Sequence, residues 1–167
     1  FVFFQCLILT TKGDVVLLTR APDLRQAQNT SIIDDIRIWV DKDKSNPTNE
    51  LKYILSELSL EKSNLGVEYE AYGLTGRNAI NLNNSLKNYA TLHDKSELIS
   101  YFRAVKSPAE IVYVKKAAEL ADKALDEVWK IAKPGASESK ILAEMQKVVF
   151  EGGGDYPANE YIVGSGH

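Results

Sequence analysis

The stretch "RAVKSPAEI", residues 103–111, has the residue order that begins a helix. Ser107 can cap the helix, Pro108 takes the first helical position, and Glu110 follows three residues after the cap. This capping box, with proline at the first position, supplies partners for amide groups that a helix start otherwise leaves unbonded. The stretch therefore predicts that a helix begins at Ser107, well past the middle of the chain.

The residues after Ser107 predict one uninterrupted helix over 107–133. Apolar residues recur along it at spacings of three and four, at Ile111, Val114, Ala118, Ala121, Leu125, Val128 and Ala132. Such spacing forms an apolar stripe on one side of a helix, which needs a covering surface. Pro134-Gly135 follows the last stripe residue and predicts the end of the helix.

A second helix and a strand are predicted in the remaining residues. The second helix starts at Ser137 and ends at Gly152-Gly153-Gly154. Residues 159–167 predict a strand that runs into a glycine turn at the end of the chain. A final strand without a following partner suggests that the chain is cut at its C-terminus, and the start on Phe1 suggests the same of its N-terminus.

Residues before Arg103 have the pattern of an α/β domain. Two β-rich runs at 1–10 and 14–19 predict a hairpin, because a short glycine-containing gap separates them. The elements predicted after the hairpin are a strand at 31–40, a helix at 51–58, a strand at 64–73, a helix at 75–88, a strand at 89–92 and a helix at 95–102. This order predicts an α/β layer around a mixed sheet.

Composition limits the function classes. The chain has 167 residues, 44% of them hydrophobic and 26% charged, which is ordinary for a globular domain or pieces of two. A formal net charge of −3 gives no electrostatic basis for binding nucleic acid or an anionic membrane. Cys6 is the single cysteine, so the chain cannot form an internal disulfide, and we expect a reducing, cytoplasmic location.

Two motifs resemble a known family. The R-x-x-K-S-P-x-E-I pattern of residues 103–111 and the K-P-G-x-S-E pattern of residues 133–138 resemble the domain junction of the creatinase/prolidase/aminopeptidase P family, the "pita-bread" metallohydrolases. "YIVGSG" at 161–166 resembles the first strand of the family's catalytic domain, and "NLGVEYEAYGLT" at 64–75 resembles a strand–helix unit of its N-terminal domain. "LLTRAPD" at 17–23 is similar to members such as ectoine hydrolase and the related dimethylsulfoniopropionate lyase.

The resemblance implies two domains. Residues 1–104 would be a creatinase-type N-terminal mixed-sheet α/β domain, and residues 105–167 the first helices and strand of a pita-bread α+β catalytic domain. The resemblance further implies that the whole protein binds two divalent metals (Mn²⁺, Co²⁺, Fe²⁺ or Zn²⁺) through two Asp, one His and two Glu, and that it is a homodimer. The metals lower the pKa of a bridging water that attacks the substrate. These ligands lie beyond the Gly-Ser-Gly turn, so we expect no metal ligand and no activity in residues 1–167.

The resemblance also gives the candidate site residues. Ser165, Gly166 and His167 would form a loop of the substrate pocket, although His167 follows the turn too closely to match the family's first pocket histidine. Arg103 and Lys106, with Ser107 and Glu110, would form the interdomain junction. Positive charges near a helix start oppose the helix dipole. This cost predicts carboxylate partners for both cations, and exposed solvated charges are the alternative.

Other polar groups favour structural roles. Adjacent residues on a strand point to opposite faces, so His93 and Asp94 are not expected to act as a pair. Glu68 and Glu70 have no histidine nearby and are expected on a solvated face. Cys6 lies in an apolar run, which favours an inert core residue over a nucleophile. Trp129 lies off the apolar stripe and is expected to cover a domain contact rather than take part in catalysis.

The sequence thus predicts part of a metal-dependent hydrolase that cleaves a C–N bond, with an Xaa-Pro peptide as substrate. A small amide of the ectoine type, or lyase chemistry like that of the related members, is an alternative within the family. A different class is a binding protein that keeps the fold without the metal. A third hypothesis, a stand-alone α/β interaction domain, is disfavoured because residues 107–166 would expose an apolar stripe and a strand edge.

Overall fold

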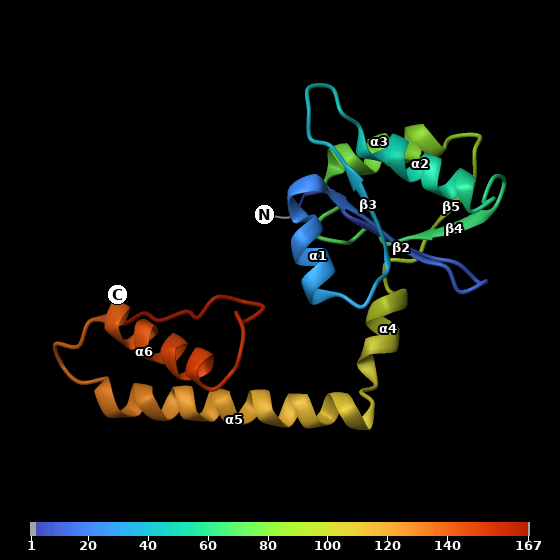
Figure 1. The fold of residues 1–167 in the computed structure, drawn as a ribbon. Helices are drawn as coiled ribbons and strands as arrows, with labels where there is room; N and C mark the ends of the chain where they lie inside the picture. Colours follow the sequence, from blue (N-terminus) through green and yellow to red (C-terminus); the bar gives the residue numbers. More distant parts are fainter. Residues whose placement is uncertain (1–2, 167) are drawn as a thin grey trace. The chain divides into compact units, whose positions relative to one another are not determined.

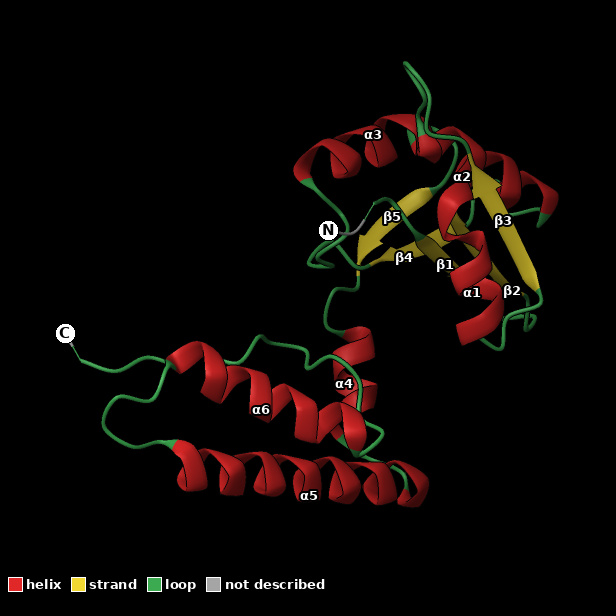
Figure 2. Cartoon of the chain, turned by 60° about the vertical axis from the view of Figure 1, so that its left-hand side comes forward, coloured by secondary structure: helices red, strands yellow, loops and turns green. Residues whose placement is uncertain are grey.

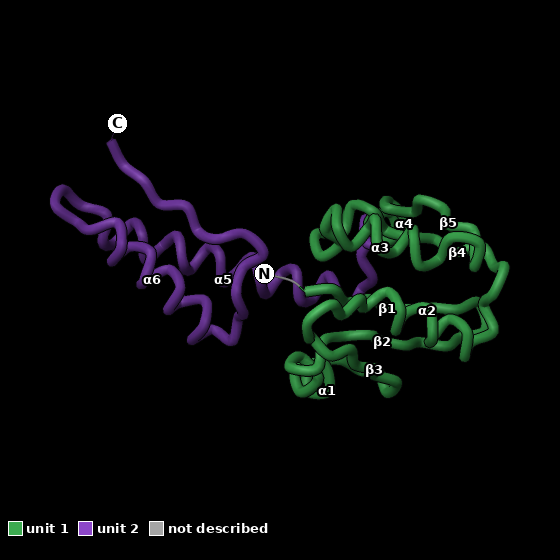
Figure 3. Tube along the Cα trace, turned by 90° about the horizontal axis from the view of Figure 1, so that it is seen from above, with its two compact units in different colours: residues 1–102 green, residues 103–167 purple. Residues whose placement is uncertain are grey.

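The computed structural model describes residues 3–166, and the chain divides into two units, residues 1–102 and 103–167 (Figure 3). The helix Leu98–Ala104 crosses the division between the units, and the helices and strands are drawn in Figures 1 and 2. In chain order these are β1 (Cys6–Leu9), β2 (Val15–Arg20), the 3₁₀ turn η1 (Ala21–Asp23), α1 (Leu24–Thr30), β3 (Asp35–Trp39), α2 (Pro47–Glu57), β4 (Asn64–Val67), α3 (Gly76–Leu86), β5 (Thr91–Asp94), α4 (Leu98–Ala104), α5 (Pro108–Ile131) and α6 (Glu138–Glu151).

The first sheet contains the predicted hairpin. β1 pairs antiparallel with β2, and β3 joins β2 in parallel, so the sheet is mixed as the sequence predicts. The turn between β1 and β2 closes where the Gly13 amide donates to the Thr10 carbonyl at 3.1 Å. Gly13 has φ +96°, a left-handed conformation that favours glycine, which explains the residue at this position.

The helix α1 is absent from the predicted pattern. Its sequence, "LRQAQNT", has too few apolar residues to form a stripe, so periodicity gives no signal. Parallel strands need a crossover connection, and α1 lies in the segment that joins β2 to β3. The helix packs against β3, so the sheet topology rather than the local sequence accounts for it.

The second sheet is a correction to the predicted single sheet. β4 and β5 form a separate two-stranded parallel sheet, because no strand pairing joins them to β1–β3 within residues 3–166. The predicted strand at 64–73 stops at Val67. Beyond it the chain forms turns in which the Ala71 amide donates to Glu68 and the Leu74 amide donates to Ala71. The other strands and helices predicted in unit 1 are present with shifted ends.

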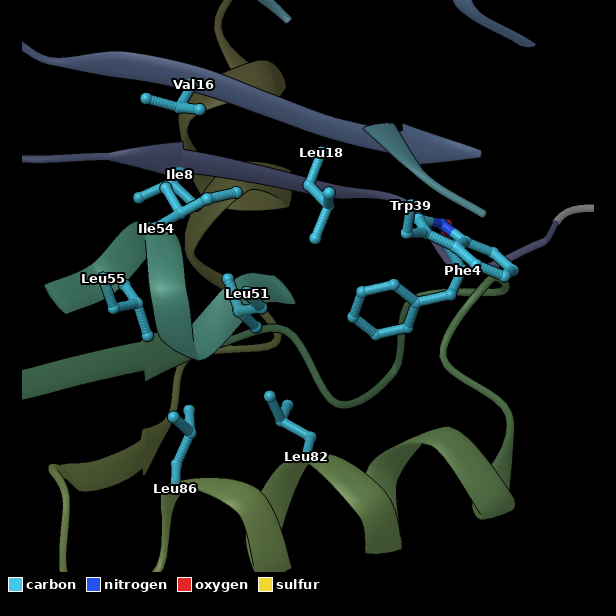
Figure 4. Close-up of a cluster of buried hydrophobic side chains, with 10 residues drawn as sticks. All are labelled: Phe4, Ile8, Val16, Leu18, Trp39, Leu51, Ile54, Leu55, Leu82 and Leu86. Carbon is cyan, nitrogen blue, oxygen red and sulfur yellow. The ribbon is translucent and has the colours of Figure 1, made fainter. Parts of the chain in front are cut away.

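The core of unit 1 lies between the strands and the helices α2 and α3 (Figure 4). Buried side chains from all of these elements meet there: Phe4, Ile8, Val16, Leu18, Trp39, Leu51, Ile54, Leu55, Leu82 and Leu86. The Trp39 indole N–H donates to the Phe4 carbonyl at 2.9 Å, so the largest core side chain also has its polar atom satisfied. Leu65, Val67 and Leu92 pack against this cluster, so both sheets share one core.

Unit 2 is a helix pair, with α5 and α6 side by side (Figures 1 and 2). The α5 helix is unbroken from Pro108 to Ile131, which confirms the predicted uninterrupted helix. Ala124 of α5 and Ile141 of α6 are the buried apolar residues of the unit. A side chain at Gly152 would collide with Leu120, and one at Gly154 would collide with Val149, which explains the glycines after α6.

The predicted strand at 159–167 is wrong for the residues that the structure describes. Residues 160–166 form no strand. A strand is defined by hydrogen bonds to a neighbour, and no backbone segment among residues 103–166 pairs with Tyr161–Val163. Within residues 3–166, no helix combines the length and the apolar character that a membrane span requires.

Candidate functional site

The interdomain junction predicted from the sequence is built around the start of α5. The Ser107 hydroxyl accepts a hydrogen bond from the Glu110 amide at 3.3 Å, and the Glu110 carboxylate accepts one from the Ser107 amide at 2.7 Å. Both halves of the predicted capping box are therefore present, with Pro108 at the first turn. The hydrogen bonds from Ser107 are the main cause of a lowered pKa for Glu110, and the charges of Lys106 and Arg103 lower it further.

The two cations of the junction serve the end of α4 as well as the start of α5. Arg103 lies in the last turn of α4, where a positive charge is favourable. The Lys106 ammonium donates to the carbonyl of Ala104, the last residue of α4, at 3.2 Å. The unfavourable interaction predicted between these charges and the dipole of α5 is therefore only part of their electrostatic effect. The same charges also interact favourably with the dipole of α4. Carboxylate partners from another part of the protein stay a prediction.

The loop predicted to line a substrate pocket is held by an acidic residue of α6. Both the amide and the hydroxyl of Ser165 donate to Glu138, at 2.7 and 2.8 Å. Gly166 has φ +82°, a conformation that favours glycine. His167 lies outside the described residues. The pocket role of Ser165, Gly166 and His167 stays a prediction.

A surface hollow lies beside the C-terminal segment of unit 2. Its volume is about 420 Å³, and α6 together with residues 156–161 lines it. The lining side chains are Leu142, Gln146, Tyr156, Pro157, Ala158, Glu160 and Tyr161. Ser165 and Gly166 are not among them, so the structure does not bring the predicted loop residues to this hollow. The hollow contains one carboxylate and no histidine, which is too few groups for a metal site.

The residues to which the sequence gives structural roles have local partners. The His93 ring bonds the Asn64 side chain at 2.9 Å, whereas Asp94 accepts from the amide and hydroxyl of Ser96, so the two neighbours have separate partners. These bonds from Ser96 lower the pKa of Asp94. Burial raises the pKa of the Cys6 thiol to about 11, so the thiolate needed of a nucleophile does not form at neutral pH.

Metal-ligating groups do not converge in the described part of the chain. Among residues 3–166, no three or more His, Cys, Asp and Glu side chains are grouped so that they could hold a metal ion. Glu68 and Glu70 are both exposed, and no histidine accompanies them.

Sequence reasoning missed Glu138 as a functional candidate. In the sequence it stands out only as the last residue of the K-P-G-x-S-E pattern, and its partner Ser165 lies far along the chain. No short motif connects the two positions. The acidic residue in the first turn of α6 is the one available signal, and it is equally typical of helix starts in general.

Two family matches lie in tandem along the chain. Residues 1–105 match the Creatinase/Prolidase N-terminal domain family, and residues 113–167 match metallopeptidase family M24. Curated relatives agree with both. Ectoine hydrolase from Halomonas elongata is 28% identical over 95% of this chain and 43% of its own length. Xaa-Pro dipeptidase from Pyrococcus horikoshii is 28% identical over 71% of this chain and 38% of its own. The chain therefore spans less than half the length of these relatives.

Solved structures share the fold. The Xaa-Pro dipeptidase from Bacillus anthracis has a TM-score of 0.67 at 22% identity, covering 89% of this chain and 39% of that protein. The X-Pro aminopeptidase from Thermotoga maritima has a TM-score of 0.67 at 18% identity, covering 89% of this chain and 40% of that protein. At these identities the likeness shows the fold alone, and it agrees with the predicted α/β domain followed by the start of a pita-bread domain.

Proposed function

Because this chain belongs to the creatinase/prolidase family of metallopeptidases, we propose that it forms the front part of a metal-dependent hydrolase that cleaves a C–N bond. The observation that carries the proposal is the tandem order of the two family matches, with the N-terminal domain first and the M24 domain second. We place the domain boundary between residues 104 and 105. The division of the chain at residues 102 and 103 and the end of the first family match at 105 support that position.

The first candidate substrate is an Xaa-Pro peptide. The Xaa-Pro dipeptidase from Pyrococcus horikoshii supports this choice in sequence, at 28% identity over 71% of this chain. The resemblance of the α4–α5 junction to that of the peptidase members supports it as well. With such a substrate, the loop of Ser165, Gly166 and His167, at the end of the Gly164–Gly166 turn, would contribute to the substrate pocket of the whole protein.

The second candidate substrate is a small amide of the ectoine type. One specific observation favours it, because the similarity to ectoine hydrolase covers 95% of this chain, against 71% for the dipeptidase at the same identity. Both candidates need hydrolysis of a C–N bond, so they share the proposed reaction class and differ only in the shape of the substrate.

The whole protein would act with two divalent metals, in the cytoplasm, as a homodimer. The metallopeptidase family supports the metals. The side chains of residues 3–166 do not fit a metal site, so the ligands would come from another part of the whole protein. The single cysteine supports a reducing location, because residues 1–167 can form no internal disulfide.

Metal removal tests the proposed function. We expect the purified whole protein, loaded with Mn²⁺ or Co²⁺, to hydrolyse either an Xaa-Pro dipeptide or ectoine, because bound divalent cations generate the attacking hydroxide at neutral pH. Dialysis against a chelator should abolish the hydrolysis, and adding the metal back should restore it. The assay measures the amine that hydrolysis releases. A dipeptide without proline is the control substrate.

Two results would contradict the proposal. Hydrolysis that the chelator does not affect would show that the reaction needs no metal. A whole protein that cleaves neither substrate with Mn²⁺, Co²⁺, Fe²⁺ or Zn²⁺ would instead favour the binding-protein class, which keeps the fold without catalysis.

A further inference from the structure

Hydrogen bonds attach the last part of the segment that follows α6 to unit 2 at one residue, Ser165. Residues 155–166 contain no helix or strand. Among the described residues, the hydrogen bonds that join positions 157–166 to the rest of the unit are the two from Ser165 to Glu138. The conformation of the Gly164–Gly166 turn therefore depends on this contact more than on backbone pairing.

The contact fixes both the backbone and the side chain of Ser165. Its amide and its hydroxyl reach the same oxygen, Oε1 of Glu138, at 2.7 and 2.8 Å. Hydrogen bonds to an ionised carboxylate are shorter and stronger than bonds between neutral groups. Two donors that converge on one acceptor also restrict the rotation of the residue, so the turn is oriented as well as attached.

Glu138 is itself fixed by α6. It is the first residue of the helix, and the amides of Lys140 and Ile141 both donate to the carbonyl of the preceding Ser137. Ile141 is buried in the helix pair, so the first turn of α6 is anchored in the core of unit 2. The position also favours a carboxylate, because the positive end of the helix dipole lies there.

The glycines of the turn themselves make no packing contact, whereas Tyr161 and Val163 before them are half-buried. A Cβ atom added at Gly164 or at Gly166 would meet no atom within 4 Å, and the side chain of Ile162 is 97% exposed. We propose that Glu138 is a positioning residue, which orients the Gly164–Gly166 turn toward the substrate. The inference rests on the proposed function, in which this turn contributes to the substrate pocket.

The anchoring step is tested on residues 1–167 without any activity assay. Backbone ¹⁵N relaxation and amide exchange are measured at Ser165 and Gly166 in the unmodified chain and in Glu138→Ala. Loss of a charge-assisted bond should speed exchange of the Ser165 amide about tenfold. Glu138→Gln keeps an acceptor without the charge, so it should give an intermediate rate. Glu144→Ala, which removes another carboxylate of α6, is the matched control and should leave Ser165 unchanged.

Unchanged exchange and relaxation at Ser165 in Glu138→Ala would overturn the proposal. If Glu138→Ala also loosens the start of α6, exchange of the Ile141 amide will report it. Ser165→Ala then decides the question, because it removes one donor and leaves the helix intact. It should increase the mobility of Gly166, and an unchanged Gly166 would again overturn the proposal.

The positioning step is tested on the whole protein. We expect Glu138→Ala to raise KM about tenfold with a smaller effect on kcat, and Glu138→Gln to recover part of the loss, because the turn contacts substrate rather than the reacting bond. If the unmodified protein is active and Glu138→Ala leaves KM unchanged, the positioning role fails while the proposed function stands. If the unmodified protein is inactive on both substrates, the proposed function fails, and the exchange experiment still decides whether Glu138 anchors the turn.

Discussion

Thr19 and Thr48 are both buried, with side chains in opposite hydrogen-bonding environments. Thr19 lies on β2, and its hydroxyl has no hydrogen-bond partner among the described residues. Thr48 is the second residue of α2, and its hydroxyl contacts Asn46 Oδ1 and Ser85 Oγ, both at 2.7 Å. A buried polar group without a partner is destabilising, whereas a paired one is costly to remove. The same substitution should therefore have opposite effects at the two positions.

Thr19→Val should raise the free energy of unfolding of unit 1 by about 1 kcal/mol, because it replaces an unbonded hydroxyl with a methyl group. Thr48→Val should lower it by about 1–2 kcal/mol, because it leaves Ser85 and Asn46 short of a partner. Urea unfolding followed by Trp39 fluorescence, in a Trp129→Phe background, measures both. A loss of stability in Thr19→Val as large as that in Thr48→Val would contradict the view that the Thr19 hydroxyl is unbonded and the Thr48 hydroxyl is bonded.

The capping box of α5 should depend on pH. Hydrogen bonds from Ser107 hold the pKa of Glu110 below its ordinary value of 4.5, so the ionised form is the one that the folded helix favours. Its contribution to stability is therefore present above pH 4.5 and is lost as the pH falls through the lowered pKa. We expect the Ser107 amide proton resonance to titrate with a midpoint below 4.5, and Glu110→Gln to abolish the titration. A midpoint above 4.5 would contradict the box.

The capping box can also be broken at Ser107 instead of at Glu110. Ser107→Ala should weaken the start of α5 by about 1 kcal/mol, a typical value for a lost N-cap. It should also shift the Glu110 titration upward, because the Ser107 side chain helps to lower the pKa of Glu110. Ser137→Ala is the matched control, because Ser137 caps α6 without a side-chain hydrogen bond. Equal losses in the two variants would show that the box itself adds nothing.

The helices and strands that the sequence predicted are those whose signals lie in neighbouring residues. The start of α5 depends on residues within one turn, and the box around Ser107 was predicted in full. The α1 helix was missed because the crossover between parallel strands requires it, and its own residues carry no apolar stripe. The Glu138–Ser165 contact was missed for a related reason, since it joins positions that no motif connects.

Over the whole molecule, unit 2 exposes much of the apolar stripe predicted on α5. Ala124 faces α6, whereas Val114 and Leu125 are each 50% exposed and Trp129 is 73% exposed. Trp129 therefore does not cover a contact within unit 2. A helix with an uncovered apolar side favours association. How the stripe would be covered in a whole enzyme could not be predicted from the sequence, because a periodic pattern shows that a surface is needed and not which one supplies it.

Residues 1–167 should self-associate as their concentration rises. The double variant Leu125→Gln/Trp129→Gln should reduce the association, because it removes exposed apolar surface without changing charge. Lys116→Gln/Lys123→Gln, on the same helix, is the control and should not reduce it. Analytical ultracentrifugation over a range of concentrations measures all three. An unmodified chain that stays monomeric at every concentration would show that the helix pair is stable without a further covering surface.

The division of unit 1 into two sheets has a consequence for how the chain folds. The β1–β2 pair closes over a short turn, whereas β4 meets β5 only after the chain has passed through the whole of α3. The entropy lost on closing a loop grows with its length, and contacts between distant residues form more slowly than local ones. The hairpin can therefore form early and independently. We expect the parallel pair to form later, together with the docking of α3, whose Leu82 and Leu86 lie in the common core.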